Sequence, residues 1–118
     1  MTAYEAGRRF EYKTINDLEA RGFVIVRAAG SAGSGKVDII AVSPVAHLWI
    51  QCKRNGVIIP GEWNRLRECA LWAGAVPILA SNGVHGRGVV YEHLIADKVP
   101  YSRTRPATLY NFPQLDNI

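Results

Sequence analysis

The fold is decided by two short stretches, VDIIAV at residues 37–42 and LWIQCK at residues 48–53. Both are rich in β-branched and apolar residues, which predicts two neighbouring strands of one sheet. Side chains alternate along a strand, so Gln51 and Lys53 share one face of the second stretch. The sheet is therefore expected to carry Asp38, from the first strand, close to a polar-x-Lys pair from the second.

Further helices and strands are expected on both sides of these two. Helical periodicity covers residues 3–21, and the apolar run after it predicts a strand over residues 23–26. Downstream, Pro60 opens a helix expected over residues 62–73, which Gly74 ends. Two more strands are expected over residues 76–80 and 89–95.

The order α-β-β-β-α-β-β predicts an α/β fold: a single domain with a central mixed β-sheet flanked by helices. A chain of 118 residues is a usual size for one hydrophobic core. We assign residues 1–99 to the domain. Residues 100–118 are expected to form a C-terminal tail that packs on the domain or extends from it.

Composition excludes several classes of protein. No apolar run approaches the roughly 20 residues that a membrane span needs, and no membrane partner is expected. Two cysteines cannot form a disulfide framework or a four-ligand zinc site. The first residues lack the layout of a signal peptide, so we expect a cytoplasmic protein. The formal net charge of +4 is compatible with a polyanionic partner.

The first predicted helix carries an anomaly at Glu11. At 100° per residue, Tyr4, Ile15 and Leu18 share an apolar face, and Glu11 falls within it. An ionised carboxylate in such a place is costly unless a cation pairs with it. Either the helix is rotated by one position, or Glu11 pairs with a buried Lys, or it faces a cation site.

These polar groups have a joint chemical rationale. Hydrolysis of a phosphodiester uses a divalent cation that neutralises the phosphate and lowers the pKa of a bound water. Mg²⁺, with Mn²⁺ as a substitute, prefers hard oxygen ligands. Glu11, Asp38, the amide oxygen of Gln51 and the backbone carbonyl of Cys52 could supply them. Lys53 would orient the attacking water or stabilise charge on the phosphate.

The pattern Asp38…Gln51-x-Lys53 resembles the signature of the PD-(D/E)xK nucleases, with Val37 in place of the Pro. The stretches GRRFE at 7–11 and RGFVIVRAAGS at 21–31 resemble the archaeal-type Holliday junction resolvases, over about residues 4–80. That resemblance implies a restriction-endonuclease-like fold. It also implies an active site made by a helix Glu, a Ser of the glycine-rich loop, the motif Asp and a Glu-x-Lys pair. The matching positions are Glu11, Ser31 or Ser34, Asp38, Gln51 and Lys53.

Gln51 departs from the family pattern, which has Glu at this position. A neutral amide can give its oxygen to a metal, but it removes one negative charge from the site. Three readings follow: a natural variant that works, an engineered substitution, or a chain that binds DNA without cutting it.

Basic residues are expected to track a DNA backbone around this site. They are Arg8, Arg9, Lys13, Lys36 and Arg54. No helix resembles a reader of the major groove, so recognition is expected to depend on DNA shape. The exposed pair Leu71 and Trp72 indicates either a subunit interface or a surface that the tail covers.

The sequence thus predicts a metal-dependent, structure-selective endonuclease that resolves four-way DNA junctions. Cutting opposite strands of a junction requires two active sites, which implies a homodimer. A prokaryotic cell or a phage-infected host would be its setting. The alternatives are another PD-(D/E)xK nuclease that acts on duplex or flap DNA, and a catalytically inactive DNA-binding module.

Overall fold

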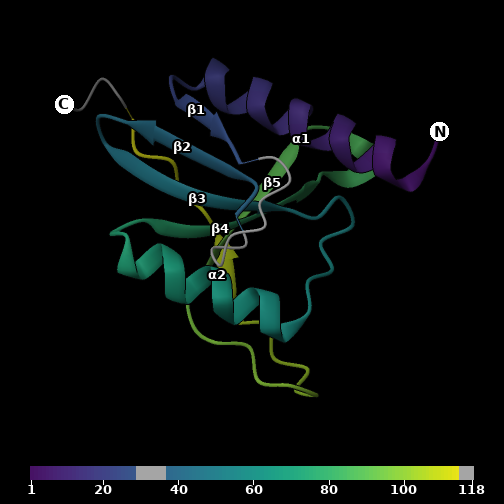
Figure 1. The fold of residues 1–118 in the computed structure, drawn as a ribbon, viewed down its shortest axis with the longest axis vertical. Helices are drawn as coiled ribbons and strands as arrows, with labels where there is room; N and C mark the ends of the chain where they lie inside the picture. Colours follow the sequence, from purple (N-terminus) through teal and green to yellow (C-terminus); the bar gives the residue numbers. More distant parts are fainter. Residues whose placement is uncertain (29–36, 115–118) are drawn as a thin grey trace.

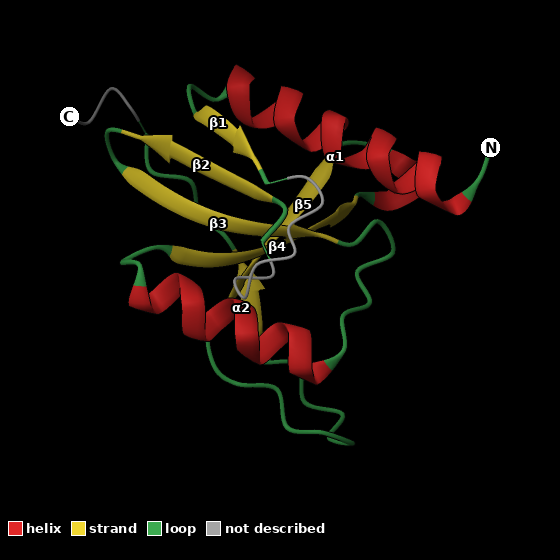
Figure 2. Ribbon diagram, in the orientation of Figure 1, coloured by secondary structure: helices red, strands yellow, loops and turns green. Residues whose placement is uncertain are grey.

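The computed structural model describes residues 1–28 and 37–114. Within them, one sheet of six strands lies between two α-helices, with α1 against one face and α2 against the other (Figures 1 and 2). The predicted α/β class and the single mixed sheet are confirmed. The elements are α1 (Ala3–Ala20), β1 (Val24–Arg27), β2 (Ile39–Ser43), β3 (Ala46–Cys52), α2 (Pro60–Trp72), β4 (Val76–Asn82), the short 3₁₀ helix η1 (Val84–Gly86), β5 (Val89–Leu94) and β6 (Ala107–Leu109).

The strands are arranged in chain order, β1-β2-β3-β4-β5-β6. All neighbours are antiparallel except β3 and β4, which run parallel. A parallel pair needs a crossover connection, and α2 provides it. Each helix packs on its own apolar cluster, one containing Phe10 and Leu18 of α1 and the other Trp63 and Leu66 of α2.

Helix α1 buries a different stripe from the predicted one. Its buried residues recur every four positions: Ala6, Phe10, Thr14 and Leu18. Thr14 belongs to this stripe because its hydroxyl donates to the Phe10 carbonyl oxygen at 2.9 Å, which satisfies the polar group inside the core. The predicted face was therefore wrong about Tyr4, which is 73% exposed. Glu11 lies at the margin of the buried stripe.

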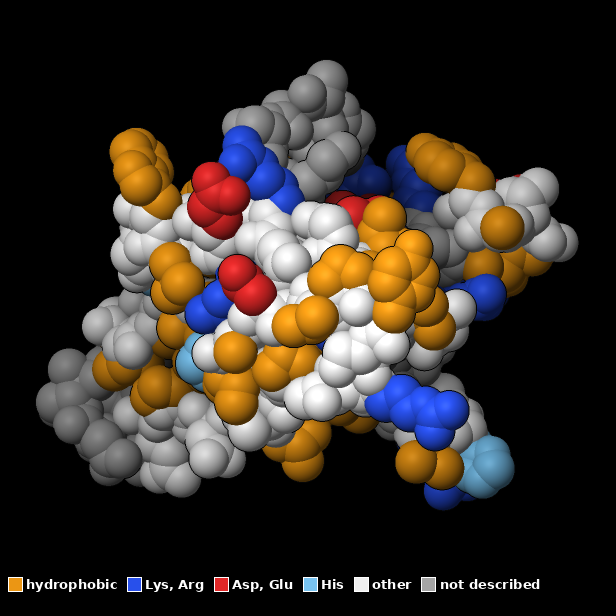
Figure 3. All heavy atoms as spheres, turned by 90° about the horizontal axis from the view of Figure 1, so that it is seen from below, with side chains coloured by type: hydrophobic (Ala, Val, Ile, Leu, Met, Phe, Trp, Pro, Cys, Tyr) orange, Lys and Arg blue, Asp and Glu red, His pale blue; other side chains and the backbone are white. Residues whose placement is uncertain are grey.

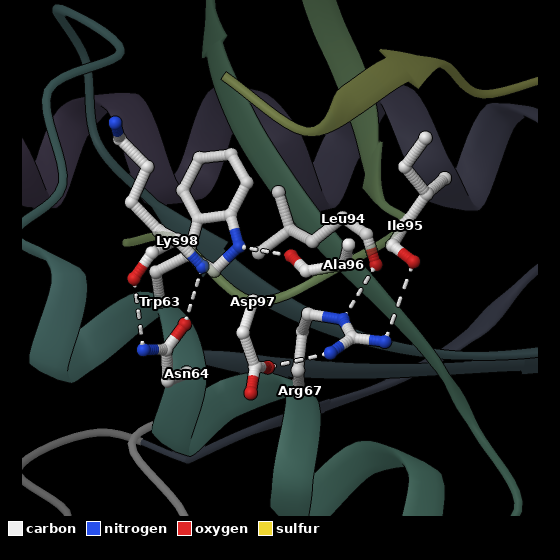
Figure 4. Close-up of polar contacts among 8 residues, drawn as sticks. All are labelled: Trp63, Asn64, Arg67, Leu94, Ile95, Ala96, Asp97 and Lys98. Atoms are coloured by element: carbon white, nitrogen blue, oxygen red, sulfur yellow. Dashed lines mark hydrogen bonds and ion pairs between the residues drawn. The ribbon is translucent and has the colours of Figure 1, made fainter. Parts of the chain in front are cut away.

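The first half of helix α2 is hydrogen-bonded to the end of β5 and to the backbone that follows it (Figure 4). The Trp63 indole donates to the Ala96 carbonyl at 2.9 Å, and Asn64 exchanges two hydrogen bonds with the backbone of Lys98. Arg67 donates to the Leu94 carbonyl at 3.1 Å. The N-terminal half of α2 is thus held in a fixed position beside the sheet.

The end of α2 follows the sequence prediction. Gly74 has φ +73, a left-handed conformation that favours glycine, and its N–H donates to the Leu71 carbonyl at 3.1 Å. Leu71 and Trp72 remain exposed, Trp72 at 91%, so the described part of the tail does not cover them. On the α2 side of the molecule, apolar side chains interrupt the charged and polar surface (Figure 3).

The segment after β5 contains a strand that the sequence did not predict. β6 adds to the edge of β5, with Leu94 opposite Ala107. Beyond it, Tyr110 and Phe112 pack on the α1-side cluster. No helix among the described residues has the length and apolar character to cross a membrane.

Candidate active site

The site lies at the end of the sheet where β2 begins and β3 ends. Asp38 directly precedes β2, and the register pairs Ile39 with Ile50, so Asp38 is placed opposite Gln51. Two hydrogen bonds hold the start of β2 against the end of β3. The Asp38 N–H donates to the Ile50 carbonyl at 2.9 Å, and the Cys52 N–H donates to Asp38 Oδ2 at 2.8 Å.

A hollow of about 610 Å³ opens at this sheet end, beneath the N-terminal half of α1. We call it the site hollow. It brings together five of the predicted site residues from α1, β3 and the loop ends: Glu11, Asp38, Gln51, Cys52 and Lys53. Its other lining residues are Ala3, Tyr4, Gly7, Arg8 and Arg27.

The surroundings of Asp38 disfavour the ionised form of its carboxyl. Burial raises the pKa of its carboxyl, and the nearby carboxylates Glu11 and Glu62 raise it further. The hydrogen bond from the Cys52 N–H and the charge of Lys53 oppose this rise in pKa without cancelling it. A cation in the hollow would relieve the repulsion.

Glu11 pairs with Arg27, the last residue of β1. Arg27 Nη2 lies 2.9 Å from Glu11 Oε2, and the Arg27 guanidinium stacks 5.2 Å from the ring centre of Tyr12. Two of the three readings of Glu11 agree with the structure: the buried face of the helix is rotated from the predicted one, and Glu11 lines the candidate cation site. The expected buried Lys was wrong, because the partner of Glu11 is the partly exposed Arg27. Arg27 was not predicted; a basic residue that ends an apolar strand is the signal that could have found it.

Gln51 is 6% exposed, and the nitrogen and oxygen of its amide differ in their hydrogen bonding. Nε2 donates to Glu62 Oε2 at 2.6 Å, whereas Oε1 is buried without a hydrogen-bond partner among the described residues. Lys53 Nζ lies 3.1 Å from the same Glu62 oxygen. Glu62, in the first turn of α2, was missed by sequence reasoning because only the fold brings it to β3.

Cys52 lines the hollow, but its thiol is not a reactive group there. Burial raises the pKa of the thiol, and the charge of Asp38 raises it further, so the thiolate is disfavoured at neutral pH. Neither Cys52 nor Cys69 forms a disulfide. The contribution of Cys52 to a site would come from its backbone.

The residues fit a cation that prefers oxygen ligands. Residues 1–28 and 37–114 contain no group of three His, Cys, Asp or Glu side chains arranged to hold a metal ion. The candidate set therefore depends on two carboxylates, Asp38 and Glu11, together with an amide and a backbone carbonyl. The buried Oε1 of Gln51, which has no partner in the part of the chain that the structure describes, is the observation that favours a cation. Such an acceptor is costly without a donor or a metal.

Three of the predicted DNA-binding residues line a second hollow, on another side of α1. This basic hollow of about 340 Å³ is lined by Met1, Ala6, Arg9, Phe10, Lys13, Arg54, Asn82 and Gly86. Lys13 Nζ donates to Asn82 Oδ1 and to the Gly86 carbonyl, both at 2.8 Å. Arg8 instead lines the site hollow. Ser31, Ser34 and Lys36 lie outside the described residues.

The mixed sheet between two helices, with Asp38 opposite a Gln-x-Lys pair at its end, is the arrangement expected of a nuclease of the PD-(D/E)xK type, with Gln51 in place of the usual Glu. The sequence profile of the archaeal Holliday junction resolvase (Hjc) family matches residues 2–92, and the chain belongs to this family. By family it is a junction-resolving endonuclease.

A solved structure agrees with this assignment. The chain is similar to Hjc, a Holliday junction resolvase from the archaeal hyperthermophile Archaeoglobus fulgidus. The two chains share 25% sequence identity and superpose with a TM-score of 0.61, over 73% of this chain and 70% of the other. The predicted family and fold class are thereby confirmed.

Proposed function

We propose that this chain is a Mg²⁺-dependent homodimeric endonuclease that cuts opposite strands of branched double-stranded DNA at a four-way junction. The observation that supports the metal dependence is the site hollow, which is lined by Asp38 and by Gln51, whose Oε1 has no partner among residues 1–28 and 37–114. The family supports the junction as substrate. Two copies of the site are needed for paired cuts, which is our reason for proposing the dimer.

In this proposal, Glu11, Asp38, Gln51 and the Cys52 carbonyl hold the ion. When bound, a divalent cation neutralises phosphate charge and acidifies a water molecule. Lys53 orients the attacking water or donates to the oxygen on which negative charge develops. Arg8, at the rim of the same hollow, binds a phosphate of the cut strand.

The basic hollow is proposed to hold DNA backbone beside the cut. Arg9, Lys13 and Arg54 present cationic groups along one side of α1. Such contacts supply affinity and orientation without reading the base sequence. From the sequence alone, Ser31 or Ser34 is proposed to contact the scissile phosphate, with Lys36 nearby. Cytoplasm of a prokaryotic or phage-infected cell is the proposed setting.

The test is cleavage of an end-labelled four-way junction, compared with a linear duplex and a flap of the same sequence. The proposal predicts paired symmetric cuts in the junction with Mg²⁺ or Mn²⁺, weak cutting of the other two, and none with EDTA. Equal cutting of all three DNAs would instead identify a nuclease of broader substrate range.

The neutral Gln51 favours a second candidate, a module that binds junctions without cutting them. This candidate predicts junction binding that is indifferent to Mg²⁺ and no cleavage by the unchanged chain. Gln51→Glu is the matched variant. Cleavage by Gln51→Glu alone would mean that the unchanged site is inactive, whereas cleavage by the unchanged chain rejects the binding module.

A further inference from the structure

We propose that Glu62 is a positioning residue that makes Gln51 a metal ligand, by fixing which end of the Gln51 amide faces the site hollow. The proposal rests on the proposed metal-dependent function. It concerns the one position where the chain departs from the family's Glu-x-Lys pattern, and it explains how a neutral residue can serve there.

In the hydrogen bond between Gln51 and Glu62, only Gln51 can be the donor. Glu62 Oε2 lies 3.1 Å from Lys53 Nζ, so this carboxylate is paired with a cation and acts as an acceptor. The amide end that approaches it to 2.6 Å must therefore be the NH₂ group of Gln51. An amide turned the other way would place two oxygens against each other.

The opposite end of the amide is consequently Oε1. It is buried, it has no hydrogen-bond partner within residues 1–28 and 37–114, and its residue lines the hollow with Asp38 and Glu11. A buried carbonyl oxygen without a donor costs free energy, and a hard cation is a partner that suits it. The contact with Glu62 thus presents an oxygen, and not a nitrogen, to the place where a cation would bind.

Glu62 itself is held firmly. The next two residues of α2, Trp63 and Asn64, are bonded to the backbone of Ala96 and Lys98, which fixes this turn of the helix (Figure 4). The first turn of a helix also favours a carboxylate electrostatically. Glu62 does not line the site hollow, so it acts through Gln51 and not as a ligand.

The experiment measures Mn²⁺ binding by isothermal titration calorimetry, without DNA, so that it does not depend on catalysis. Glu62→Met removes the acceptor and the charge at nearly constant size. It should weaken Mn²⁺ binding by about 10- to 100-fold, as is usual for partners of metal ligands. Glu62→Gln, which keeps an oxygen that can accept from Gln51, should lose less. Glu68→Met is the control, because Glu68 lies on the same helix, forms an exposed ion pair with Arg65 and does not line the site hollow.

A double variant separates positioning from a merely structural role. A carboxylate at position 51 presents an oxygen whichever way it turns, so it does not need Glu62. Combining Gln51→Glu with Glu62→Met should therefore restore Mn²⁺ binding to at least the level of the unchanged chain. A structural role for Glu62 would lower the melting temperature in both variants and give no such rescue.

The outcomes distinguish this inference from the proposed function. Equal Mn²⁺ affinity of the unchanged chain and Glu62→Met would overturn the inference and leave the metal site standing. Weakened binding by Glu62→Met that the double variant does not restore would also overturn it. Absence of Mn²⁺ binding in the unchanged chain and in every variant would overturn the proposed metal dependence, and the inference with it.

Discussion

The two hollows beside α1 differ in how their charges are satisfied. In the site hollow, Asp38 is half-buried near other carboxylates, and Gln51 has an unpartnered oxygen among the described residues. In the basic hollow, Lys13 already donates to Asn82 and Gly86, and its neighbours Arg9 and Arg54 are exposed to solvent.

The difference indicates two separate tasks. A hollow that contains an acceptor without a donor and a carboxylate near other carboxylates is suited to a cation. Binding of the cation would remove the free-energy cost of both. A hollow whose cations are hydrated or paired with protein gains from a polyanion mainly by releasing counterions. Changes in the first should therefore affect cleavage, and changes in the second should affect DNA affinity.

The largest effect is expected from Asp38→Asn. It removes a ligand charge while the amide oxygen can still accept from the Cys52 N–H, so the fold should be retained. Cleavage of a four-way junction should fall by about a thousandfold or more, equivalent to about 4 kcal/mol. Junction affinity, measured by gel shift in EDTA, should change by less than about threefold. A variant that still cuts at the original rate would remove Asp38 from the catalytic site.

Lys53→Ala should have the next largest effect on cleavage. Loss of a group that orients water or stabilises developing charge costs about 10²- to 10³-fold in rate. Single-turnover cleavage with saturating enzyme measures this loss without a contribution from DNA affinity. If the rate at saturation is unchanged, Lys53 acts only in binding.

A smaller effect, and on binding alone, is expected from the basic hollow. Arg9→Ala and Arg54→Ala should each weaken junction binding and lower the slope of log affinity against log salt by about 1. Arg103→Ala, an exposed basic residue outside both hollows, is the control. A loss of cleavage rate at saturating enzyme in Arg9→Ala or Arg54→Ala would contradict the separation of tasks.

The smallest expected effect is on stability. Because the pKa of Asp38 is raised in the folded chain, the folded state binds the proton of this carboxyl more tightly than the unfolded state does. The unchanged chain therefore loses stability as the pH rises through the raised pKa. The Asp38→Asn variant does not lose stability in this way, because an amide does not ionise. In EDTA its melting temperature should exceed that of the unchanged chain at pH 7, and the difference should vanish toward pH of about 4. A lower melting temperature of the variant at pH 7 would contradict the unfavourable charge at Asp38.

Local patterns were sufficient for most of the fold. Strand alternation and apolar runs predicted β2 and β3, and hence the sheet end that carries Asp38 and Gln51. They did not predict β6, because three residues form a strand there only through pairing with β5. The buried face of α1 was misplaced because Thr14 counts as polar in a pattern, although its hydroxyl is satisfied within the helix.

The site was predicted in part for a similar reason. Glu11, Asp38, Gln51, Cys52 and Lys53 could be selected from residue types and spacing, and the fold gathers all five around one hollow. Arg27, which pairs with Glu11, was marked only by its place at the end of an apolar strand, and Glu62, which holds Gln51, had no such mark. Their roles depend on which side chains meet across the sheet end, and no periodicity in the chain records that.

We infer that the site hollow carries out cleavage and that the basic hollow binds DNA. The most direct test is a single-turnover reaction in which the junction is first bound without metal, and Mg²⁺ is then added to start cleavage. We predict paired symmetric cuts by the unchanged chain, and a stable, uncut complex with Asp38→Asn that survives the addition of Mg²⁺. An unchanged chain that binds the junction but never cuts it, or an Asp38→Asn variant that cuts, would contradict this division of tasks.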